Sequence, residues 1–202
     1  TEANTIASKT TGAVTAAVSN TALADYAALT ETDNAYTITL NDASVDASAL
    51  RALDAKTTVA FTATSMTSLS GSYADVLAVL NSAGVTTSST ADAIALTITG
   101  SISVAEANTL DGLTEVGVVT ATISTSDMAS LASLAASSGT AHAYSITVTD
   151  SSVDAADLNT LAGKTSVDVN ASAVTTLTGG TANVADFSTA YGGGSGISGL
   201  GN

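Results

Sequence analysis

Two stretches of this 202-residue chain repeat one another without a gap, and this repetition constrains the fold more than any other feature. Ala35–Leu69 aligns with Ala143–Leu177, 108 residues later, and Gly12–Leu29 aligns with Gly117–Leu134 at an offset of 105. The octapeptide LNTLAGKT at 158–165 has counterparts at 3–10, 50–57 and 107–114. Self-similarity at such spacings is typical of repeat architectures, in which each unit buries its apolar face against its neighbours.

Short runs of alternating apolar and polar residues predict strands with one buried face. We expect strands near 13–18, 36–41, 58–64, 94–99, 117–123, 144–149 and 166–171. The inward positions are predicted to be Tyr36, Ile38, Leu40, Val59, Phe61, Ala63, Leu96, Ile98, Val119, Ala121, Ile123, Ile146, Val148, Val167 and Val169.

Short helical segments, with apolar residues three or four apart, separate these strands. Asp46 and Asp154 are predicted N-caps, because a carboxylate can accept the free N–H groups of a first helical turn. The succession of strand, turn and short helix predicts a parallel β-solenoid with short helices on one side. It would consist of about seven leucine-rich-repeat-like α/β coils. A pair of ordinary α/β domains is the alternative that the same alternation allows.

We expect a single solenoid domain over residues 1–191. Its repeat units are predicted at about 1–34, 35–92, 93–142 and 143–191. Residues 192–202 are rich in glycine and are expected to be a linker or the start of a next repeat. The first residues resemble the end of a repeat helix, so we expect the chain to be a segment of a longer protein.

The charge balance excludes whole classes of partner. Four basic residues stand against 18 acidic ones, a net charge of −14. Such a surface repels nucleic-acid phosphates and anionic lipid headgroups. No run of about 20 apolar residues exists, so membrane insertion is not expected. There is no cysteine, so disulfide chemistry gives no information on location.

A Thr-x-Thr pattern occupies the predicted outward strand positions. It becomes Asp168 and Asn170 in the last strand. On neighbouring parallel strands, such threonines would form two files about 4.8 Å apart along the stacking direction. This resembles the ice-binding face of solenoid antifreeze proteins, although threonine is also simply a good strand former on an exposed face. The candidate residues are Thr37, Thr39, Thr62, Thr64, Thr97, Thr99, Thr120, Thr122, Thr147 and Thr149.

Four aspartates are the candidate metal ligands. Asp42 with Asp46, and Asp150 with Asp154, sit four apart in equivalent turns, where paired carboxylates could bind Ca²⁺. Helix capping explains Asp46 and Asp154 adequately, so it is the favoured interpretation of these two residues, and we expect no other cofactor. His142, the only histidine, lies in a polar stretch and is expected at the surface. No catalytic pattern of nucleophile, base and carboxylate is present, so an enzyme is not expected.

The segments SVDAADLNTLAGKT, ASAVTTLTGG and GISGLGN resemble repeats of giant acidic, cysteine-poor surface proteins of bacteria, notably marine cyanobacteria. The resemblance covers nearly the whole chain. It implies an extracellular, saline or calcium-rich setting and a structural or adhesive role.

We therefore expect an extracellular or cell-surface structural and interaction protein. It would be a segment of a larger surface protein, or would assemble into a filament, a surface layer or an adhesive stalk. Its predicted partners are further copies or neighbouring repeats, joined end to end through exposed sheet edges. Glycans on the Thr- and Ser-rich surface are a further expected partner. The alternative is a binding module that recognises ice or carbohydrate through its threonines.

Overall fold

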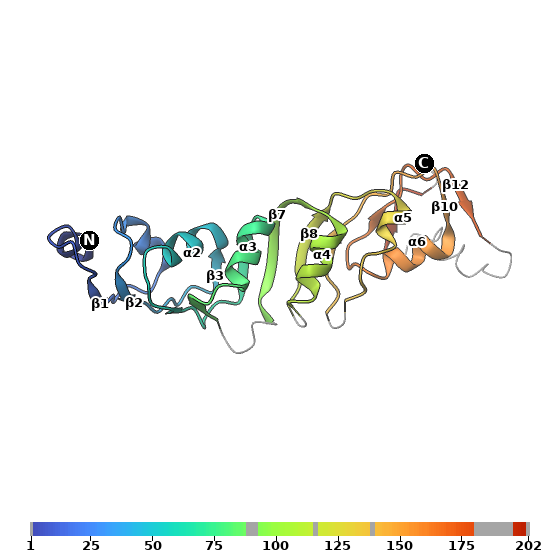
Figure 1. Cartoon of the computed structure of the whole chain (residues 1–202). Helices are drawn as coiled ribbons and strands as arrows, with labels where there is room; N and C mark the ends of the chain where they lie inside the picture. The colour runs from blue at the N-terminus through green and yellow to red at the C-terminus, as the bar shows by residue number, and fades with distance from the viewer. Residues whose placement is uncertain (1, 88–92, 115–116, 138–139, 180–195, 201–202) are drawn as a thin grey trace. The chain divides into compact units, whose positions relative to one another are not determined.

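The computed structural model describes residues 2–87, 93–114, 117–137, 140–179 and 196–200. These residues form a mixed α/β structure of short strands and short helices (Figure 1). The chain divides into two compact units, Thr1–Thr97 and Ile98–Asn202. No helix of the described ranges is long and apolar enough to cross a membrane.

The described residues of the first unit contain four helices and the first six strands. Its helices are α1 (Glu2–Ala7), the 3-10 helix η1 (Leu23–Ala28), α2 (Ala47–Asp54) and α3 (Tyr73–Leu80). Its strands are β1 (Thr15–Ala17), β2 (Ala35–Thr37), β3 (Ser44–Asp46), β4 (Phe61–Thr62), β5 (Ser68–Gly71) and β6 (Val85–Thr86). Helices α2 and α3 pack side by side (Figure 1).

Strand β7 (Ala95–Ile102) contains the division between the units. The second unit continues with helices α4 (Val104–Asp111), α5 (Met128–Leu131) and α6 (Ala155–Ala162). Its remaining strands are β8 (Val119–Ile123), β9 (Ala143–Ser145), β10 (Ser152–Asp154), β11 (Val169–Asn170), β12 (Thr176–Thr178) and β13 (Ile197–Ser198).

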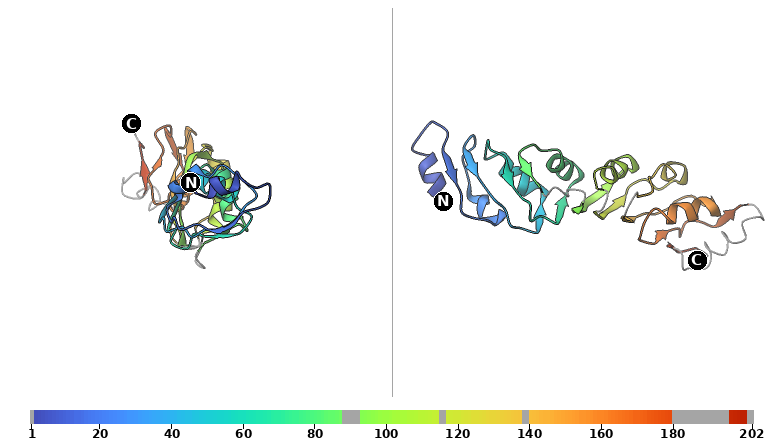
Figure 2. Two further views of the ribbon diagram at one scale, coloured as in Figure 1. Left: turned by 90° about the vertical axis from the view of Figure 1, so that its left-hand side faces the viewer. Right: turned by 90° about the horizontal axis from the view of Figure 1, so that it is seen from below.

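The strands in the described parts of the chain form several small sheets. One has five strands in the order β3-β5-β7-β8-β9, and four have two strands, β1-β2, β4-β6, β10-β12 and β11-β13. Figure 2 shows β1 and β2 (blue) side by side. The two strands are parallel, and Ala16 pairs with Tyr36. Every pairing with a defined register is parallel.

The predicted solenoid of about seven leucine-rich-repeat-like coils is wrong. The described residues form a mixed α/β structure with several small parallel sheets, rather than coils that share one sheet. The prediction assumed one strand for each turn and helix. Instead, the Asp/Ser segments that are predicted as turns contain two further strands, β3, which pairs with β5, and β10, which pairs with β12.

Each of the seven predicted strands overlaps an observed one, namely β1, β2, β4, β7, β8, β9 and β11. The strands that we missed are β3, β5, β6, β10, β12 and β13. Most of them span two or three residues, with a single inward apolar side chain such as Val45 or Val153. A run this short contains too little alternation to be recognised as a strand.

The predicted inward positions are buried, with two exceptions. Val59 and Val167 are 39% and 40% exposed. They occupy equivalent positions, and the backbone N–H of each donates to the hydroxyl of the threonine two residues earlier, at 3.2 Å. This local turn precedes the strand, so the alternation begins only at Phe61 and Val169. The predicted repeat boundaries remain a prediction, and the boundary at 191 lies outside the described residues.

The two predicted N-caps are confirmed. The Asp46 carboxylate accepts the Ala49 N–H at 2.9 Å at the start of α2, and that of Asp154 accepts the Ala156 N–H at 2.9 Å at the start of α6. The Ser48 hydroxyl, 2.6 Å from Asp46, and then the Ala49 N–H lower the pKa of Asp46. The negative charge therefore stabilises the start of α2.

We expect Asp46→Ala to lower the free energy of unfolding by about 1 kcal/mol at neutral pH, because a helix loses its N-cap. Since the folded-state pKa is lowered, this contribution is complete above the unfolded pKa of about 4 and shrinks as pH falls through the folded value. Urea unfolding at several pH values measures it. The control Asp168→Ala removes an exposed carboxylate outside any helix. An equal loss in both variants would contradict the capping role.

Candidate binding face

The ten threonines of the predicted binding face lie on strands or beside them. Nine are exposed, and Thr62 is half-buried. The residues that pair with these threonines on the neighbouring strands differ between the two units. In the first unit Thr39 pairs with Thr62, and Thr62 pairs with Thr86. We call these three residues the threonine row. Residues at such positions on neighbouring strands lie about 4.8 Å apart.

The sequence predicts two rows of threonines along the sheet. Outside the threonine row, no pairing of known register places one of the ten threonines beside another threonine. Thr37 lies beside Ala17. In the second unit Thr120 lies beside Ala143, Thr122 beside Ser145, and Thr147 beside Asn170. Thr149 donates instead to the Ser126 carbonyl at 3.3 Å. In the pairings whose register is known, the outward face therefore combines threonine with alanine, serine and asparagine, and three threonines in succession occur only in the first unit.

The four candidate metal ligands bind backbone N–H groups. Besides the caps at Asp46 and Asp154, the Asp42 carboxylate accepts the Leu23 N–H at 2.8 Å, and that of Asp150 accepts the Met128 N–H at 2.8 Å. Both contacts hold the start of the preceding helix, η1 or α5. Among the described residues, no three His, Cys, Asp or Glu side chains gather as they would around a metal ion. Calcium binding by these residues remains a prediction.

A buried threonine hydroxyl joins two chain segments in each unit. In the first, the Thr57 hydroxyl accepts the Tyr36 N–H and donates to the Tyr36 carbonyl, both at 3.0 Å. In the second, the Thr165 hydroxyl accepts the Tyr144 N–H at 3.0 Å and donates to the Tyr144 carbonyl at 2.8 Å. Thr57 and Thr165 are the last residues of the repeated octapeptide, at 50–57 and 158–165. The recurrence of this threonine therefore has a structural cause.

A second buried polar position is also shared, although its residue type differs. The Asn34 amide oxygen accepts the Val14 N–H at 2.8 Å. At the equivalent place, 108 residues later, His142 Nδ1 lies 3.1 Å from the Val119 N–H. Because Nδ1 accepts there, Nε2 carries the proton and donates to the Asp111 carboxylate 2.8 Å away.

The prediction that His142 lies at the surface is wrong, since only 2% of it is exposed. Its ring also meets that of Tyr144 edge to face, with centroids 5.3 Å apart. Burial strongly raises the pKa of Tyr144, and the Asp111 charge raises it further. The repeat alignment could have located this buried histidine, because it places His142 opposite Asn34. The polar composition of residues 135–141 instead favours a surface loop, and it led to the prediction that His142 is exposed.

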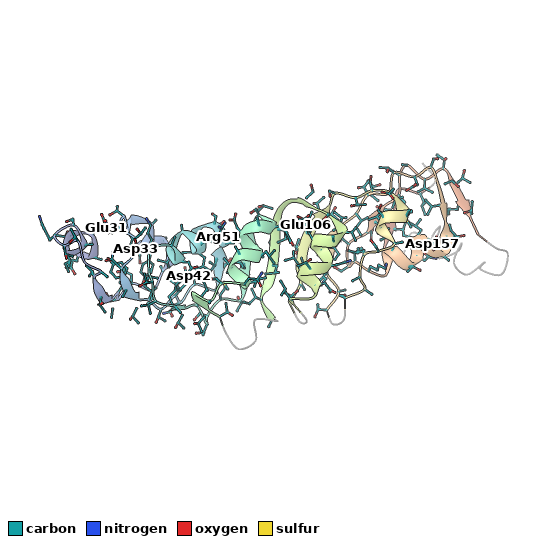
Figure 3. All side chains as sticks on the ribbon, viewed as in Figure 1. Glu31, Asp33, Asp42, Arg51, Glu106 and Asp157 are labelled. Carbon is teal, nitrogen blue, oxygen red and sulfur yellow. The ribbon has the colours of Figure 1, made fainter. Side chains whose placement is uncertain are left out.

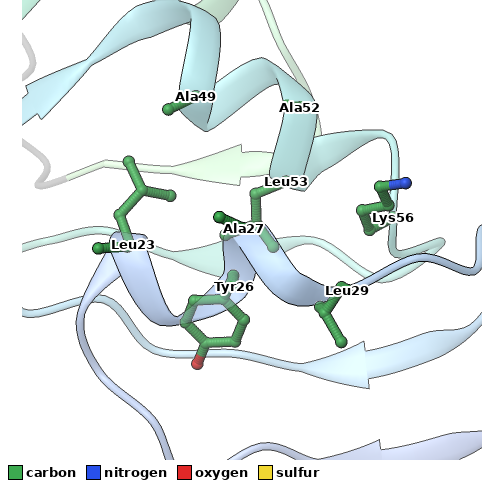
Figure 4. A pocket seen from close by; sticks show the side chains of 9 residues that line it. Leu23, Tyr26, Ala27, Leu29, Ala49, Ala52, Leu53 and Lys56 are labelled. Atoms are coloured by element: carbon green, nitrogen blue, oxygen red, sulfur yellow. The ribbon is translucent and has the colours of Figure 1, made fainter. Parts of the chain in front are cut away.

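An apolar groove of about 290 Å³ lies between η1 and α2 (Figure 4). Leu23, Tyr26, Leu29 and Leu53 line it, together with exposed alanines. The Lys56 ammonium group lies at the Leu29 end and donates to the Thr30 carbonyl at 3.3 Å. In the second unit, Lys164 donates to the Ala132 carbonyl at 2.9 Å, beside a groove of about 430 Å³. Each lysine follows one helix, α2 or α6, and binds a carbonyl just after the helix before that one, η1 or α5.

Charged side chains are distributed along the surface, as Glu31, Asp42, Glu106 and Asp157 illustrate in Figure 3. Arg51 pairs with Asp75 between α2 and α3. The Ser72 hydroxyl and then Arg51 lower the pKa of Asp75. An exposed pair of this kind contributes little to stability in salt, because water and ions screen it.

Comparison with known proteins gives no relative from which a role could be transferred. The chain matches no protein-family model, no curated protein and no solved structure.

Proposed function

We propose that this chain is a structural and interaction repeat protein of the cell surface, and that it forms part of a larger surface protein, a filament, a surface layer or an adhesive stalk. The observation that carries the proposal is the use of polar side chains at recurring positions. Thr57 with Thr165, Asn34 with His142, and Asp42 with Asp150 hold backbone groups in both units. In each pair, what recurs is a contact that maintains the chain path.

The charge and the sequence resemblance support the same proposal. A net charge of −14 with few basic residues keeps a protein soluble in saline water, where screening limits repulsion within the chain. The similarity to acidic repeats of marine bacterial surface proteins supports an extracellular setting. A protein whose task is extension or contact needs a repeated, stable surface, and both units provide one.

Immunogold labelling of intact cells of the source organism, with antibodies raised against this chain, tests the proposal. We expect gold particles on the outer surface, on a filament, a lattice or a fibre visible in negative stain. Permeabilised cells provide the control for antibody access. Labelling that appears only after permeabilisation would contradict a surface role.

The threonine row favours a second candidate function, the binding of ice or carbohydrate. Thr39 and Thr86 are exposed and Thr62 is half-buried. Thr62 and Thr86 lie on the parallel strands β4 and β6, and Thr39 forms a single parallel bridge to Thr62. Hydroxyl and methyl groups repeated at a strand spacing of about 4.8 Å can meet a regular array of oxygen atoms.

If the threonine row binds ice, the wild-type chain should show thermal hysteresis, and Thr39→Leu should abolish most of it. Leucine removes an exposed hydroxyl at one end of the row and adds bulk beside Thr62. Thr160→Leu, on α6 in the second unit, should retain the hysteresis. Nanolitre osmometry measures the effect, and a glycan array with the same variants tests carbohydrate. No hysteresis and no glycan binding by the wild type would eliminate this candidate.

A further inference from the structure

The end of strand β11 contains a sequence of the form that accepts N-linked glycans. Among the ten asparagines of the chain, Asn170 is the one with a serine or threonine two residues later, in Asn170-Ala171-Ser172. In proteins that leave the cytoplasm, an Asn-x-Ser or Asn-x-Thr triplet is where a glycan is attached to the asparagine side chain. We call residues 170–172 the acceptor triplet.

The acceptor triplet lies at the surface of the second unit. The side chains of Asn170 and Ser172 are exposed, and Ala171 between them is buried. Thr147 and Ser198 pair with Asn170 from the two neighbouring segments, and both are short, exposed residues. A bulky group on Asn170 can therefore extend into solvent without displacing a buried side chain.

The amide of Asn170 is held at its oxygen end. The Ser172 N–H donates to Asn170 Oδ1 at 3.1 Å. The backbone of Asn170 is also fixed, because its N–H donates to the Ile146 carbonyl at 2.9 Å and its carbonyl accepts the Val148 N–H at 2.8 Å. Within the described residues, Asn170 Nδ2 has no hydrogen-bond partner. The nitrogen that a glycan would modify is thus the available end of an otherwise fixed residue.

The first unit has different residues at the equivalent place. At the offset of 108, the acceptor triplet corresponds to residues 62–64, Thr-Ala-Thr, and Asp168 corresponds to Ala60. Asp168 is exposed, and the alternation along the strand places it on the same outward face as Asn170. Its carboxylate offers a charged contact to a cationic group of a glycan-transferring enzyme. The threonine pattern of the outward face is therefore replaced, in the second unit, by an acidic residue and a glycan acceptor.

We propose that Asn170 is N-glycosylated and that its glycan covers the outward face of the second unit beside Thr147 and Ser198. The donor is a glycan linked through pyrophosphate to a membrane lipid. Asn170 Nδ2 attacks the anomeric carbon of the first sugar and forms a C–N bond, while the bond from that carbon to the pyrophosphate oxygen breaks. The lipid pyrophosphate leaves, and Nδ2 gives up one proton to a base of the transferase.

This inference rests on the proposed function, because such a glycan is added to chains that leave the cytoplasm. It specifies one covalent partner of the surface that the proposed function requires. A glycan is bulky and strongly hydrated, so it keeps the outward face around Asn170 in contact with water.

Mass spectrometry of the protein purified from its source organism tests the proposal on the native chain. The peptide that contains the acceptor triplet should have the mass of an attached glycan, and fragmentation should locate that mass on Asn170. The unmodified peptide, in protein that immunogold labelling places on the cell surface, would overturn this inference alone. Protein found only inside the cell would overturn the surface role as well.

Export of the 202-residue chain to the periplasm of a bacterial host, which contains an oligosaccharyltransferase and its lipid-linked glycan, tests the acceptor itself. The wild type should gain the mass of one glycan. Asn170→Gln and Ser172→Ala should lose it completely, while Ser172→Thr retains the hydroxyl and should keep it. The control Asn41→Gln removes an exposed asparagine outside any such triplet and should be modified like the wild type. An unmodified wild type, or a glycan that persists in Asn170→Gln, would overturn the proposal.

Discussion

Thr165→Val should lower the free energy of unfolding of the second unit by about 2–4 kcal/mol, although the two side chains have nearly the same shape. The hydroxyl accepts the N–H groups of Tyr144 at 3.0 Å and Val167 at 3.2 Å and donates to the Tyr144 carbonyl. Valine leaves these groups without a partner in a site that is 8% exposed. Each unsatisfied buried polar group costs about 1–3 kcal/mol.

Hydrogen exchange of individual segments measures this loss separately in each unit. We expect faster exchange within the second unit and little change in residues 2–87. Thr165→Ser retains the hydroxyl and should retain most of the protection, while Thr147→Val removes an exposed hydroxyl and should change stability by less than about 0.5 kcal/mol. Thr57→Val should produce the matching loss in the first unit. Wild-type exchange in Thr165→Val would refute the role of the hydroxyl.

His142→Leu should destabilise the second unit by about 2–4 kcal/mol, since it removes the acceptor for the Val119 N–H and the donor to the Asp111 carboxylate. His142→Asn should recover part of this loss. Asparagine places its amide oxygen where Nδ1 lies, as Asn34 does for the Val14 N–H in the first unit. Chemical denaturation monitored by circular dichroism, together with segment-resolved exchange, compares the three proteins.

The repeat itself supplies the control for this prediction. Asn34→Leu should destabilise the first unit by removing the acceptor for Val14, without any effect on a carboxylate. If His142→Asn proved no more stable than His142→Leu, the backbone contact would not be the stabilising one. The hydrogen bond between His142 and the Asp111 carboxylate would then account for the whole loss of stability.

Much of the local structure could be predicted from the residues. The alternation that ends in Tyr36, Ile38 and Leu40 predicts a strand with one buried face, and all three are about 1% exposed. The caps Asp46 and Asp154 follow from the same kind of argument, because the oxygen that caps a helix belongs to a residue adjacent to it. Interactions within a few residues are encoded by nearby sequence.

The candidate sites could be predicted less well, because the strand register determines which side chains are neighbours. The Thr-x-Thr pattern identifies outward positions, but only the pairing of Thr39 with Thr62 and of Thr62 with Thr86 shows which hydroxyls are neighbours. Asp42 and Asp150 are predicted as metal ligands together with the caps Asp46 and Asp154, and that prediction stays open. The tertiary structure adds that each holds the first N–H of a helix that ends before it in the sequence.

The sequence by itself determined the repeat, the positions of seven strands, the two caps and the acidic character of the chain. Only the tertiary structure decided how the strands are shared among sheets, that His142 is buried and that Val59 and Val167 are exposed. The physical reason is the length of the elements. A strand of three residues around Val45 or Val153 is too short to be stable alone, and it exists because a parallel neighbour satisfies its backbone. That neighbour lies more than 20 residues away, beyond the reach of local periodicity.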